Sequence, residues 1–348
     1  MVTMRDVAAK AGVSQATVSY ALNNHPSIPE ATRRKVLKAA EALHYRTNVS
    51  AKTLRSGKTD AIGLILQDFS NPYYSLLANA ISRRAMQNGL QVLVQQTIYE
   101  KDNEIAILGH LVNSFCDGVI FTPTRLSSRD IKRQLAGRPG LILGPTDSSA
   151  GLDTISVDCI AGIEATTRAV LAAGCTRPFF LGLPYRPISE LASVVDSGWQ
   201  RVFGFEQALE EDGIAYDEEN FLACHWERKP ASDFMDEYLE SLPDLKNLPF
   251  DALVCVNDDS ALGAYLSLKR HGISIPEQVC LTGFDGIPDG QLVDPQITTA
   301  VLDFDYFADE AVRMISERIN EKLTDAPHAP ARHLSVHTHL LERGTTAR

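Results

Sequence analysis

The sequence predicts a small all-α segment at the start of the chain and a larger doubly wound α/β body after it. Three observations lead to this expectation. A chain of 348 residues exceeds what one hydrophobic core usually organises, so we expect two or three compact units. Apolar residues recur at helical spacing over roughly the first 43 residues. From residue 61 onward, short apolar runs alternate with helical stretches, as in parallel sheets that helices cover on both faces.

The composition is ordinary for a globular protein in water, with 44% hydrophobic and 22% charged residues. No apolar run approaches the roughly 20 residues that a membrane span needs, so no membrane partner is expected. The first residues, Met1–Asp6, lack the apolar stretch of a secretory signal, which favours the cytoplasm. The six cysteines show no metal-ligand spacing, so the sequence predicts buried free thiols, no metal site and no cofactor.

The net charge of −11 conceals two segments of opposite sign. Residues 1–58 contain ten lysine and arginine residues against three acids and carry a net charge of +7. The remainder contains 23 basic and 41 acidic residues and carries −18. A basic segment attached to an acidic body is expected when one part of a protein neutralises phosphates and the other stays off the nucleic acid.

The basic segment reads as three short helices. The first ends at the turn residue Gly12, and Ser14 is a good N-cap for the second, which runs to about residue 22. The third begins near Pro29 and runs to about Leu43. The inward-facing apolar positions are Val7, Ala8, Ala11, Val18, Ala21, Leu22, Val36, Ala39, Ala40 and Leu43. This arrangement is a helix-turn-helix, with Gln15, Ala16, Ser19 and Tyr20 left free, although other three-helix bundles share the pattern.

Particular residues distinguish the segment from an arbitrary bundle. The run Asp6-Val7-Ala8-x-x-Ala11-Gly12-Val13-Ser14-x-x-Thr17-Val18-Ser19-x-x-Leu22-Asn23, with Thr32-Arg33-x-x-Val36 and Leu43-x-Tyr45 after it, closely resembles the headpiece of the lactose-repressor (LacI/GalR) family. The resemblance implies a sequence-specific transcription regulator that binds double-stranded DNA. The DNA-contacting residues that it implies are Ser14, Gln15, Ala16, Thr17, Ser19, Tyr20, Asn23, Lys52, Leu54 and Arg55.

Residues 48–58 correspond to the hinge helix of that family and are too short to form a stable helix alone in water. The resemblance implies that two hinge helices pair in the minor groove and that Leu54 is the wedge inserted between base steps. Lys52 and Arg55 flank Leu54 and suit contact with phosphates. The alternative is that Leu54 only packs between domains.

The body, residues 59–348, follows a headpiece of residues 1–47 and the hinge. Its predicted strands are Ala61–Leu66, Leu90–Val94, Gly118–Phe121, Leu141–Leu143, Phe179–Leu183, Ala252–Val256 and Val279–Phe284. So many strands, with their helices, favour two similar lobes. The resemblance implies lobes like those of periplasmic sugar-binding proteins, and we place the three chain crossings near 157–160, 287–291 and 322–328. The first lobe then comprises 59–157 and 291–322, and the second comprises 160–287 and 328–341.

Ligands of open α/β sheets bind beyond the carboxyl ends of the strands. Three predicted strands are followed by polar runs that contain Asp68, Asp258 and Asp285, and we expect all three carboxylates to line the effector site. Paired hydrogen-bonding groups beside aromatic faces suit a sugar ring. By resemblance, the hydrogen-bonding ligands of a small-molecule effector are Arg201, Asn257 and Asp285, and its aromatic walls are Tyr73, Tyr74 and Trp226.

These residues also have purely structural interpretations, which the sequence leaves open. Asn257 and Asp258 could cap a helix. Tyr73 and Tyr74 could pack the start of theirs, and Asp285 could serve only its tight turn.

The resemblance implies a homodimeric repressor whose affinity for a pseudo-palindromic operator is set by an effector bound between the lobes. A sugar is favoured as the effector, with a nucleobase or another metabolite as the alternative. A glycoside hydrolase that uses Asp68, Asp258 and Asp285 is the enzymatic alternative. The sequence contains no Ser/His/Asp motif, Walker loop or G-x-G-x-x-G motif, so we expect no catalytic residues. A transport binding protein would share the body but would need a secretory signal.

Tyr20→Arg is expected to change base preference more than overall affinity. Many members of the resembled family carry arginine at this position, where it can contact guanine through two hydrogen bonds, whereas Gln15 suits adenine and Ala16 suits the thymine methyl group. Binding to a set of operator variants measures the preference. An equal loss of affinity for every variant would contradict the assignment.

Overall fold

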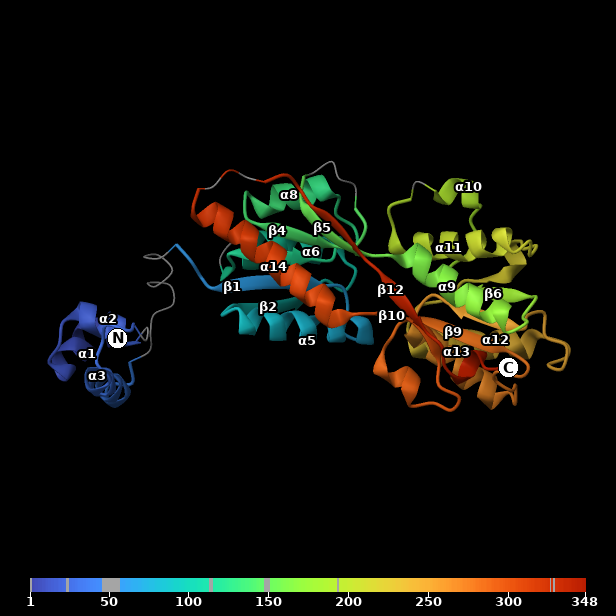
Figure 1. The fold of residues 1–348 in the computed structure, drawn as a ribbon, viewed down its shortest axis with the longest axis horizontal. Coiled ribbons are helices and arrows are strands. Elements are labelled where there is room, and N and C mark those ends of the chain that lie inside the picture. Colours follow the sequence, from blue (N-terminus) through green and yellow to red (C-terminus); the bar gives the residue numbers. More distant parts are fainter. Residues whose placement is uncertain are drawn as a thin grey trace. The chain divides into compact units, whose positions relative to one another are not determined.

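The computed structural model describes residues 2–22, 25–45, 57–112, 115–146, 151–192, 194–325, 327 and 329–348. The chain divides into two compact units, Met1–Thr59 and Asp60–Arg348 (Figure 1). The first unit is all-α and the second is α/β, so the predicted fold class is confirmed.

In its described residues, 2–22, 25–45 and 57–59, the first unit contains three helices around a small apolar core. They are α1 (Met4–Ala11), α2 (Gln15–Leu22) and α3 (Glu30–Ala42). Thr3 caps α1, and Gly12 ends it with a φ of 62°, a left-handed conformation that glycine adopts without strain. Val7, Val18 and Val36, one from each helix, are fully buried. The second helix is therefore fixed against the other two, as the helix-turn-helix interpretation requires.

The first lobe of the body is a parallel sheet of six strands in the order β11-β5-β4-β3-β1-β2. The strands are β1 (Ala61–Leu66), β2 (Gln91–Gln96), β3 (Gly118–Phe121), β4 (Gly140–Leu143), β5 (Asp153–Val157) and β11 (His333–Val336). One face is covered by α5 (Pro72–Gln87) and α14 (Phe304–Leu323). The other is covered by α6 (Lys101–Ala106), the π-helix η1 (Ile107–Val112) and α8 (Ser128–Leu135). Because side chains alternate along a strand, Leu64 packs on the first face and Ile65 on the second.

The second lobe repeats this architecture with a sheet in the order β12-β10-β9-β8-β6-β7. The strands are β6 (Pro178–Leu181), β7 (Phe221–Leu222), β8 (Ala252–Cys255), β9 (Cys280–Asp285), β10 (Thr298–Leu302) and β12 (Thr338–Leu341). Only β12 is antiparallel to its neighbour. One face is covered by α9 (Cys159–Ala172) and α11 (Ser197–Glu211), the other by α12 (Arg228–Ser241) and α13 (Asp258–Arg270). Short helices in the connections are α10 (Ile188–Leu191), η3 (Glu218–Asn220), η4 (Pro288–Gln291) and η5 (Gly344–Thr346).

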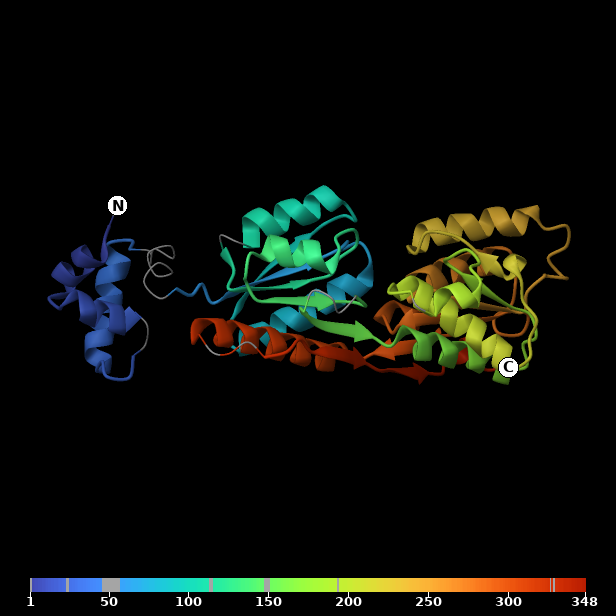
Figure 2. The same ribbon diagram turned by 90° about the horizontal axis from the view of Figure 1, so that it is seen from above.

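The chain passes between the two lobes three times, along one side of both (Figure 2). Strand β5 leads into α9, β10 leads back into α14, and β11 leads into β12. The strands at these crossings lie at the β11 edge of the first sheet and the β12 edge of the second. The edges formed by β2 and β7 are therefore the ones farthest from the crossings.

The second and third crossings are not at the predicted positions, 287–291 and 322–328. Residues 298–302 add β10 to the second sheet, and residues 333–336 add β11 to the first. Assigning 291–322 to the first lobe and 328–341 to the second is therefore wrong for these strands. Strand β10 begins with two threonines, and β11 exposes alternate polar residues, so neither is the continuous apolar run from which strands such as β1 and β3 were predicted.

Glu206 in α11 is a carboxyl group buried without a hydrogen-bond partner. It is fully buried, and neither carboxylate oxygen has a partner among the described residues. Burial, followed by the charge of Glu210, raises the pKa of Glu206 from its ordinary value of 4.5 to about 8. The folded protein therefore keeps a proton on Glu206 that the unfolded chain releases above about pH 4.5.

Glu206→Gln is expected to remove a pH dependence of stability. In the wild type, stability should fall as the pH rises from about 4.5 to about 8, because only the folded state still binds the Glu206 proton in that window. Without this titration the variant should be more stable at pH 8, by on the order of a few kcal/mol. Urea unfolding across this pH range measures the difference, with the exposed Glu237→Gln as control. A variant with the wild-type pH profile would disprove the assignment.

Candidate functional site

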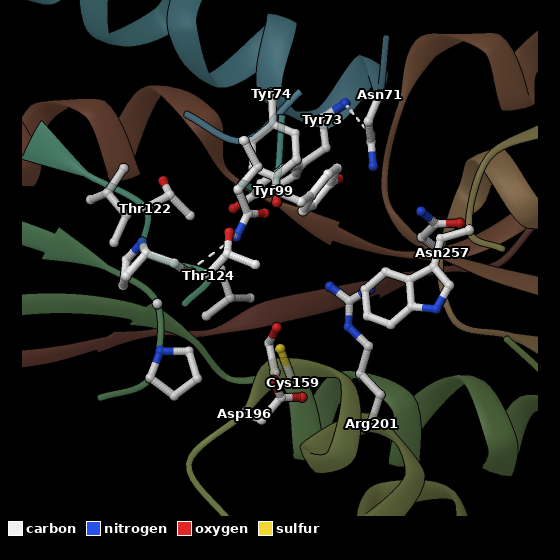
Figure 3. A pocket seen from close by; sticks show the side chains of 18 of the residues that line it. Asn71, Tyr73, Tyr74, Tyr99, Thr122, Thr124, Cys159, Asp196, Arg201 and Asn257 are labelled. Carbon is white, nitrogen blue, oxygen red and sulfur yellow. Dashed lines mark hydrogen bonds between the residues drawn. The ribbon is translucent and has the colours of Figure 1, made fainter. Parts of the chain in front are cut away.

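A cavity of about 1140 Å³ lies between the two lobes of the body (Figure 3). Its walls are built by segments that follow the carboxyl ends of β1, β2, β3 and β4 in the first lobe and of β6, β7, β8 and β9 in the second. This is where parallel α/β sheets bind ligands, because the strand ends and the loops beyond them converge there. The location matches the expectation from the sequence.

The structure brings six of the eight predicted effector residues to this cavity. They are Tyr73, Tyr74, Arg201, Trp226, Asn257 and Asp285. Asp68 and Asp258 are not among the residues that line it. Asp68 accepts a hydrogen bond from the Ser70 amide at 2.8 Å within its own loop. Asp258 is fully buried and faces the backbone behind the cavity wall, so placing these two carboxylates in the cavity is a correction to the sequence-based prediction.

Arg201 and Asp285 form a buried ion pair in the second lobe. Arg201, from α11, is only 8% exposed. Its Nη2 lies 3.4 Å from Asp285 Oδ1, and its Nη1 donates to the Val256 carbonyl at 2.5 Å. The guanidinium also lies 4.0 Å from the Phe284 ring centroid and 5.8 Å from that of Trp226. Val256 and Asp285 therefore use two of the five N–H donors of the guanidinium, and Nε is buried with no partner among the described residues.

Asp285 is held in an unusual backbone conformation at the end of β9. Its φ is 107°, in the region that side chains other than glycine rarely adopt. The turn that follows Asp285 is held in place, because the Ile287 amide donates to Asp258 Oδ2 at 2.8 Å. Burial raises the pKa of Asp285 to about 6, although Arg201 opposes the rise. Burial, together with the charge of Asp285, raises the pKa of Asp258 to about 8.

Asn257 has both a structural and a cavity-facing role. Its side chain accepts a hydrogen bond from the Ser260 amide at 2.8 Å, which caps α13, and it also lines the cavity. The capping interpretation therefore does not exclude contact with a ligand. Asp258, by contrast, is the first residue of α13 and not its cap.

Aromatic side chains form two walls of the cavity. Asn71 caps α5 by accepting from the Tyr73 amide at 3.0 Å, which fixes the helix start that carries Tyr73 and Tyr74. These two rings meet edge to face with centroids 5.1 Å apart. On the second lobe, Trp226 Nε1 donates to the Gly182 carbonyl at 3.2 Å, so the indole is anchored rather than loose.

Several cavity residues were not predicted from the sequence. One is Gln67. Others, labelled in Figure 3, are Tyr99, Thr122, Thr124, Cys159 and Asp196. Thr122 and Thr124 directly follow β3, so the rule that found the other residues could have found them. Asp196 caps α11 through the amides of residues 198 and 199 and has the sequence signature of a helix start.

The loop after β3 is held in place by the buried carboxylate of Glu104. Glu104 Oε1 accepts from the Thr124 amide at 2.7 Å, and its Oε2 accepts from the Leu126 amide at 3.0 Å. Gln67 Nε2 donates to Thr124 Oγ1 at 2.9 Å, which connects this loop to the end of β1. The polar rim of the first lobe is therefore held by hydrogen bonds within the protein.

The cavity offers hydrogen-bonding groups of both kinds beside apolar ring faces, which suits a compact ligand with several hydroxyl groups. Among the described residues, no cluster of three or more His, Cys, Asp or Glu side chains could hold a metal ion. No helix in the described parts of the chain is long and apolar enough to cross a membrane.

The headpiece presents most of the predicted DNA-contacting residues of α2 to solvent. Gln15 and Ala16 are exposed, and Tyr20 is 49% exposed with its ring stacked on His25 at 4.8 Å. Ser19 is only 8% exposed, which corrects the expectation that it is free; it follows the buried Val18 on the inner side of α2.

Two other predicted DNA contacts lie at the start of α2, and the rest are outside the described structure. Ser14 is exposed, and its hydroxyl accepts from the Thr17 amide at 3.1 Å. Thr17 is half-buried. Asn23, Lys52, Leu54 and Arg55 lie outside the described residues, so the hinge assignment stays a prediction.

Comparison with known proteins places both units in one family. Residues 3–48 match "Bacterial regulatory proteins, lacI family", and residues 59–337 match "Periplasmic binding proteins and sugar binding domain of LacI family". The HTH-type transcriptional regulator GalS of Salmonella typhimurium is 31% identical over 300 residues, which cover 86% of this chain and 84% of GalS.

Solved structures share the fold of the whole chain. The complex of the transcriptional regulator CelR with cellobiose has a TM-score of 0.69 at 23% identity, covering 99% of this chain and 100% of that one. The lac repressor dimer bound to operator and the anti-inducer ONPF has a TM-score of 0.80 at 22% identity, covering 100% of this chain and 99% of that one.

Gly283→Ala is expected to destabilise the body. A Cβ atom at Gly283 would overlap with the carboxylate of Asp258, which is fully buried and cannot swing away. Overpacking of this kind typically costs about 1–3 kcal/mol. Urea unfolding measures the loss, with Gly109→Ala as control, because the nearest atom to a Cβ there is Gln134 Oε1 at 3.7 Å. Equal stability of the two variants would contradict the packing of Asp258 under β9.

Proposed function

Because the chain belongs to the LacI family of bacterial regulatory proteins, we propose that it is a transcription repressor whose affinity for operator DNA is controlled by a sugar bound between its lobes. It is a DNA-binding regulator with a sugar-binding type of body, and not an enzyme. The repressor role, the sugar and the roles of individual residues are the proposed parts. Acting on DNA places it in the cytoplasm.

The observation that carries the proposal is the buried Arg201–Asp285 pair beside aromatic walls. A sugar needs donors and acceptors for neighbouring hydroxyl groups and a flat apolar face for its ring. The guanidinium has more N–H donors than Val256 and Asp285 use, and the Asp285 carboxylate can accept from hydroxyl groups. Asn257 adds an amide from the start of α13, and Tyr74 and Trp226 supply ring faces from opposite lobes.

A sugar is favoured over a nucleobase by the polar groups that surround the cavity on both lobes. Thr122, Thr124 and Gln67 on the first lobe face Asp196 and Arg201 on the second. Such a distribution suits a ligand with hydroxyl groups around its whole edge. The cellobiose complex of CelR supports the same choice. A nucleobase stacked on Tyr74 is the second candidate.

The headpiece is proposed to read DNA as one of a symmetric pair. Residues 1–58 carry a net charge of +7, and Gln15, Ala16 and Tyr20 are exposed on α2. A two-fold symmetric homodimer would recognise a pseudo-palindromic operator, the arrangement in which the lac repressor was solved as a dimer on its operator. In this arrangement the hinge residues, with Leu54 as wedge, lie between the two headpieces and the bodies.

Effector control follows from a ligand that contacts both lobes. A ligand shifts a conformational equilibrium only if it binds one state more tightly than the other. Since three crossings of the chain connect the lobes, a sugar bridging them favours one arrangement of the lobes. That arrangement of the lobes determines how the two hinge segments of a dimer approach the DNA. Sugar binding in the cavity and operator binding by the headpieces are thereby coupled.

The test combines a thermal-shift screen of sugars and nucleobases with binding of genomic DNA fragments, each repeated with the other ligand present. A sugar that raises the unfolding temperature and changes affinity for one fragment is the expected result. Because many phosphate contacts are involved, this affinity should fall roughly a thousandfold or more between low and moderate salt. No preference for any fragment over random duplex, with or without metabolites, would refute the proposal.

Asp285→Asn is expected to abolish the effector response and to leave operator binding intact. The substitution keeps the size of the side chain but removes the charge that neutralises Arg201 and accepts sugar hydroxyl groups. Effector affinity should fall about tenfold or more, since a hydrogen bond to a charged group contributes about 1.5–3 kcal/mol. Calorimetric titration and DNA binding measure the two effects, with the exposed Asp233→Asn as control. A retained response would remove Asp285 from the site.

A further inference from the structure

The turn after β2, residues Thr97–Glu100, has a backbone that its residues disfavour. Ile98 has a φ of 54° and Tyr99 a φ of 57°, two consecutive left-handed residues of which neither is glycine. Each such residue costs roughly 1–2 kcal/mol, and a β-branched residue in this region is a genuine outlier. Turns of this kind usually carry glycine, asparagine or aspartate.

The surrounding backbone enforces this conformation. The Thr97 amide donates to the Leu66 carbonyl at 3.0 Å, and the Ile98 amide donates to the Gln67 carbonyl at 2.8 Å. These bonds continue the pairing of β2 with β1 beyond the end of the sheet. The Thr97 carbonyl accepts from the Glu100 amide at 3.1 Å, which closes the turn, and from Asn103 Nδ2 at 3.0 Å. The turn is therefore fixed from both sides.

Core packing does not explain the strain. Ile98 is 53% exposed, so the less favourable of the two residues leaves its apolar side chain in solvent. Of the two strained residues, Tyr99 is the one whose side chain lines the cavity. Strained residues that the surrounding structure holds in place are typical of ligand sites.

Tyr99 reaches the aromatic wall of the first lobe. Its side chain forms a hydrogen bond with that of Tyr74. Figure 3 shows Tyr73, Tyr74 and Tyr99 gathered on one side of the cavity. Burial, and then the charges of Asp68 and Glu227, raise the pKa of Tyr99 to about 12, so the phenol stays protonated at neutral pH. When Tyr74 donates this hydrogen bond to the Tyr99 oxygen, the hydroxyl proton of Tyr99 is free for an acceptor on a ligand.

The turn Thr97–Glu100 also lies far from the chain crossings. It follows β2, the edge strand of the first sheet that is farthest from the chain crossings. Trp226 and Glu227 follow β7, which is the corresponding edge of the second sheet. A hinge motion that opens or closes the lobes at the crossings moves these two far edges more than the strands beside the crossings. Tyr99 and Glu227 therefore lie where a closing cleft changes most.

We propose that Tyr99 is a specificity-determining residue, which contacts the bound sugar at the outer edge of the cleft and donates its free hydroxyl proton to a sugar oxygen. The strained turn serves to hold this phenol in position before the ligand arrives. The inference rests on the proposed function, because it requires a ligand rich in oxygen acceptors in this cavity. Tyr99 adds a proposed ligand contact from the turn after β2. The other proposed contacts come from helix starts and from the ends of other strands.

The experiment titrates the full-length protein with glucose, galactose, ribose, maltose and cellobiose by calorimetry. Tyr99→Phe should weaken the sugar that the wild type binds best about three- to tenfold, the effect of one hydrogen bond, and should change the ranking of the sugars. Tyr99→Ala should weaken it further. Operator affinity without sugar should stay within twofold for both variants.

Two further variants separate ligand contact from a structural role. Ile98→Gly relieves the strain and should raise the unfolding temperature while Tyr99 still binds sugar. Tyr306→Phe removes a hydroxyl from an exposed tyrosine on α14 that does not line the cavity, and it should change nothing.

The outcomes distinguish this inference from the proposed function. Wild-type affinities and sugar ranking in both Tyr99 variants would overturn the role of Tyr99 and leave the sugar-binding function standing. A wild type that binds none of these sugars, but binds a nucleobase, would overturn the proposed sugar effector and this inference with it. A selective change of the sugar ranking in Tyr99→Phe, absent from Tyr306→Phe, supports it.

Discussion

The cavity depends on a positive charge that has been removed from water. Arg201 is almost fully buried, and a buried guanidinium is tolerated only where it is neutralised and hydrogen-bonded. Asp285 supplies the opposite charge, Val256 supplies a carbonyl acceptor, and Phe284 covers one side of the guanidinium. Asp285 can do this only because its backbone is turned into a rare conformation, above a carboxyl group of Asp258 that holds the next turn. One electrostatic requirement thus connects α11, β9 and α13.

Both lobes position their cavity residues by the same physical device. In each, a buried carboxyl group accepts hydrogen bonds from the backbone of a loop that follows a strand. Glu104 does so for the loop after β3, and Asp258 does so for the turn after β9. Glu104 and Asp258 satisfy these backbone amides on the side away from the cavity. The side chains of Thr124 and Asp285 therefore remain available to the cavity. The two lobes therefore hold their cavity walls with comparable internal hydrogen bonds.

The sequence predicted features that depend on local pattern and missed those that depend on tertiary geometry. The headpiece helices, and cavity residues such as Arg201 and Asn257, follow from periodicity, family motifs and the rule that ligands bind at strand ends. Ser19 was misjudged because one step along a helix separates an outer from an inner position. Asp68 and Asp258 follow strands as expected, but their side chains turn toward backbone amides. Tyr99 was missed because strand β2 extends beyond its apolar core to Gln96, so the residue stands further along the chain than the predicted strand end suggested. Its left-handed conformation has no signature in isoleucine or tyrosine.

The interleaved chain path imposes an order on biosynthesis. The first sheet contains β5, which ends at Val157, and its edge neighbour β11, which begins at His333; helix α14 is also needed to cover one face. A ribosome adding about 5–20 residues per second needs roughly 10–35 seconds to cover that interval. During this time the unfinished lobe exposes a strand edge and an apolar face, while the headpiece has long since left the exit tunnel. The nascent body is therefore a natural client for chaperones that shield apolar surface until the last strands arrive.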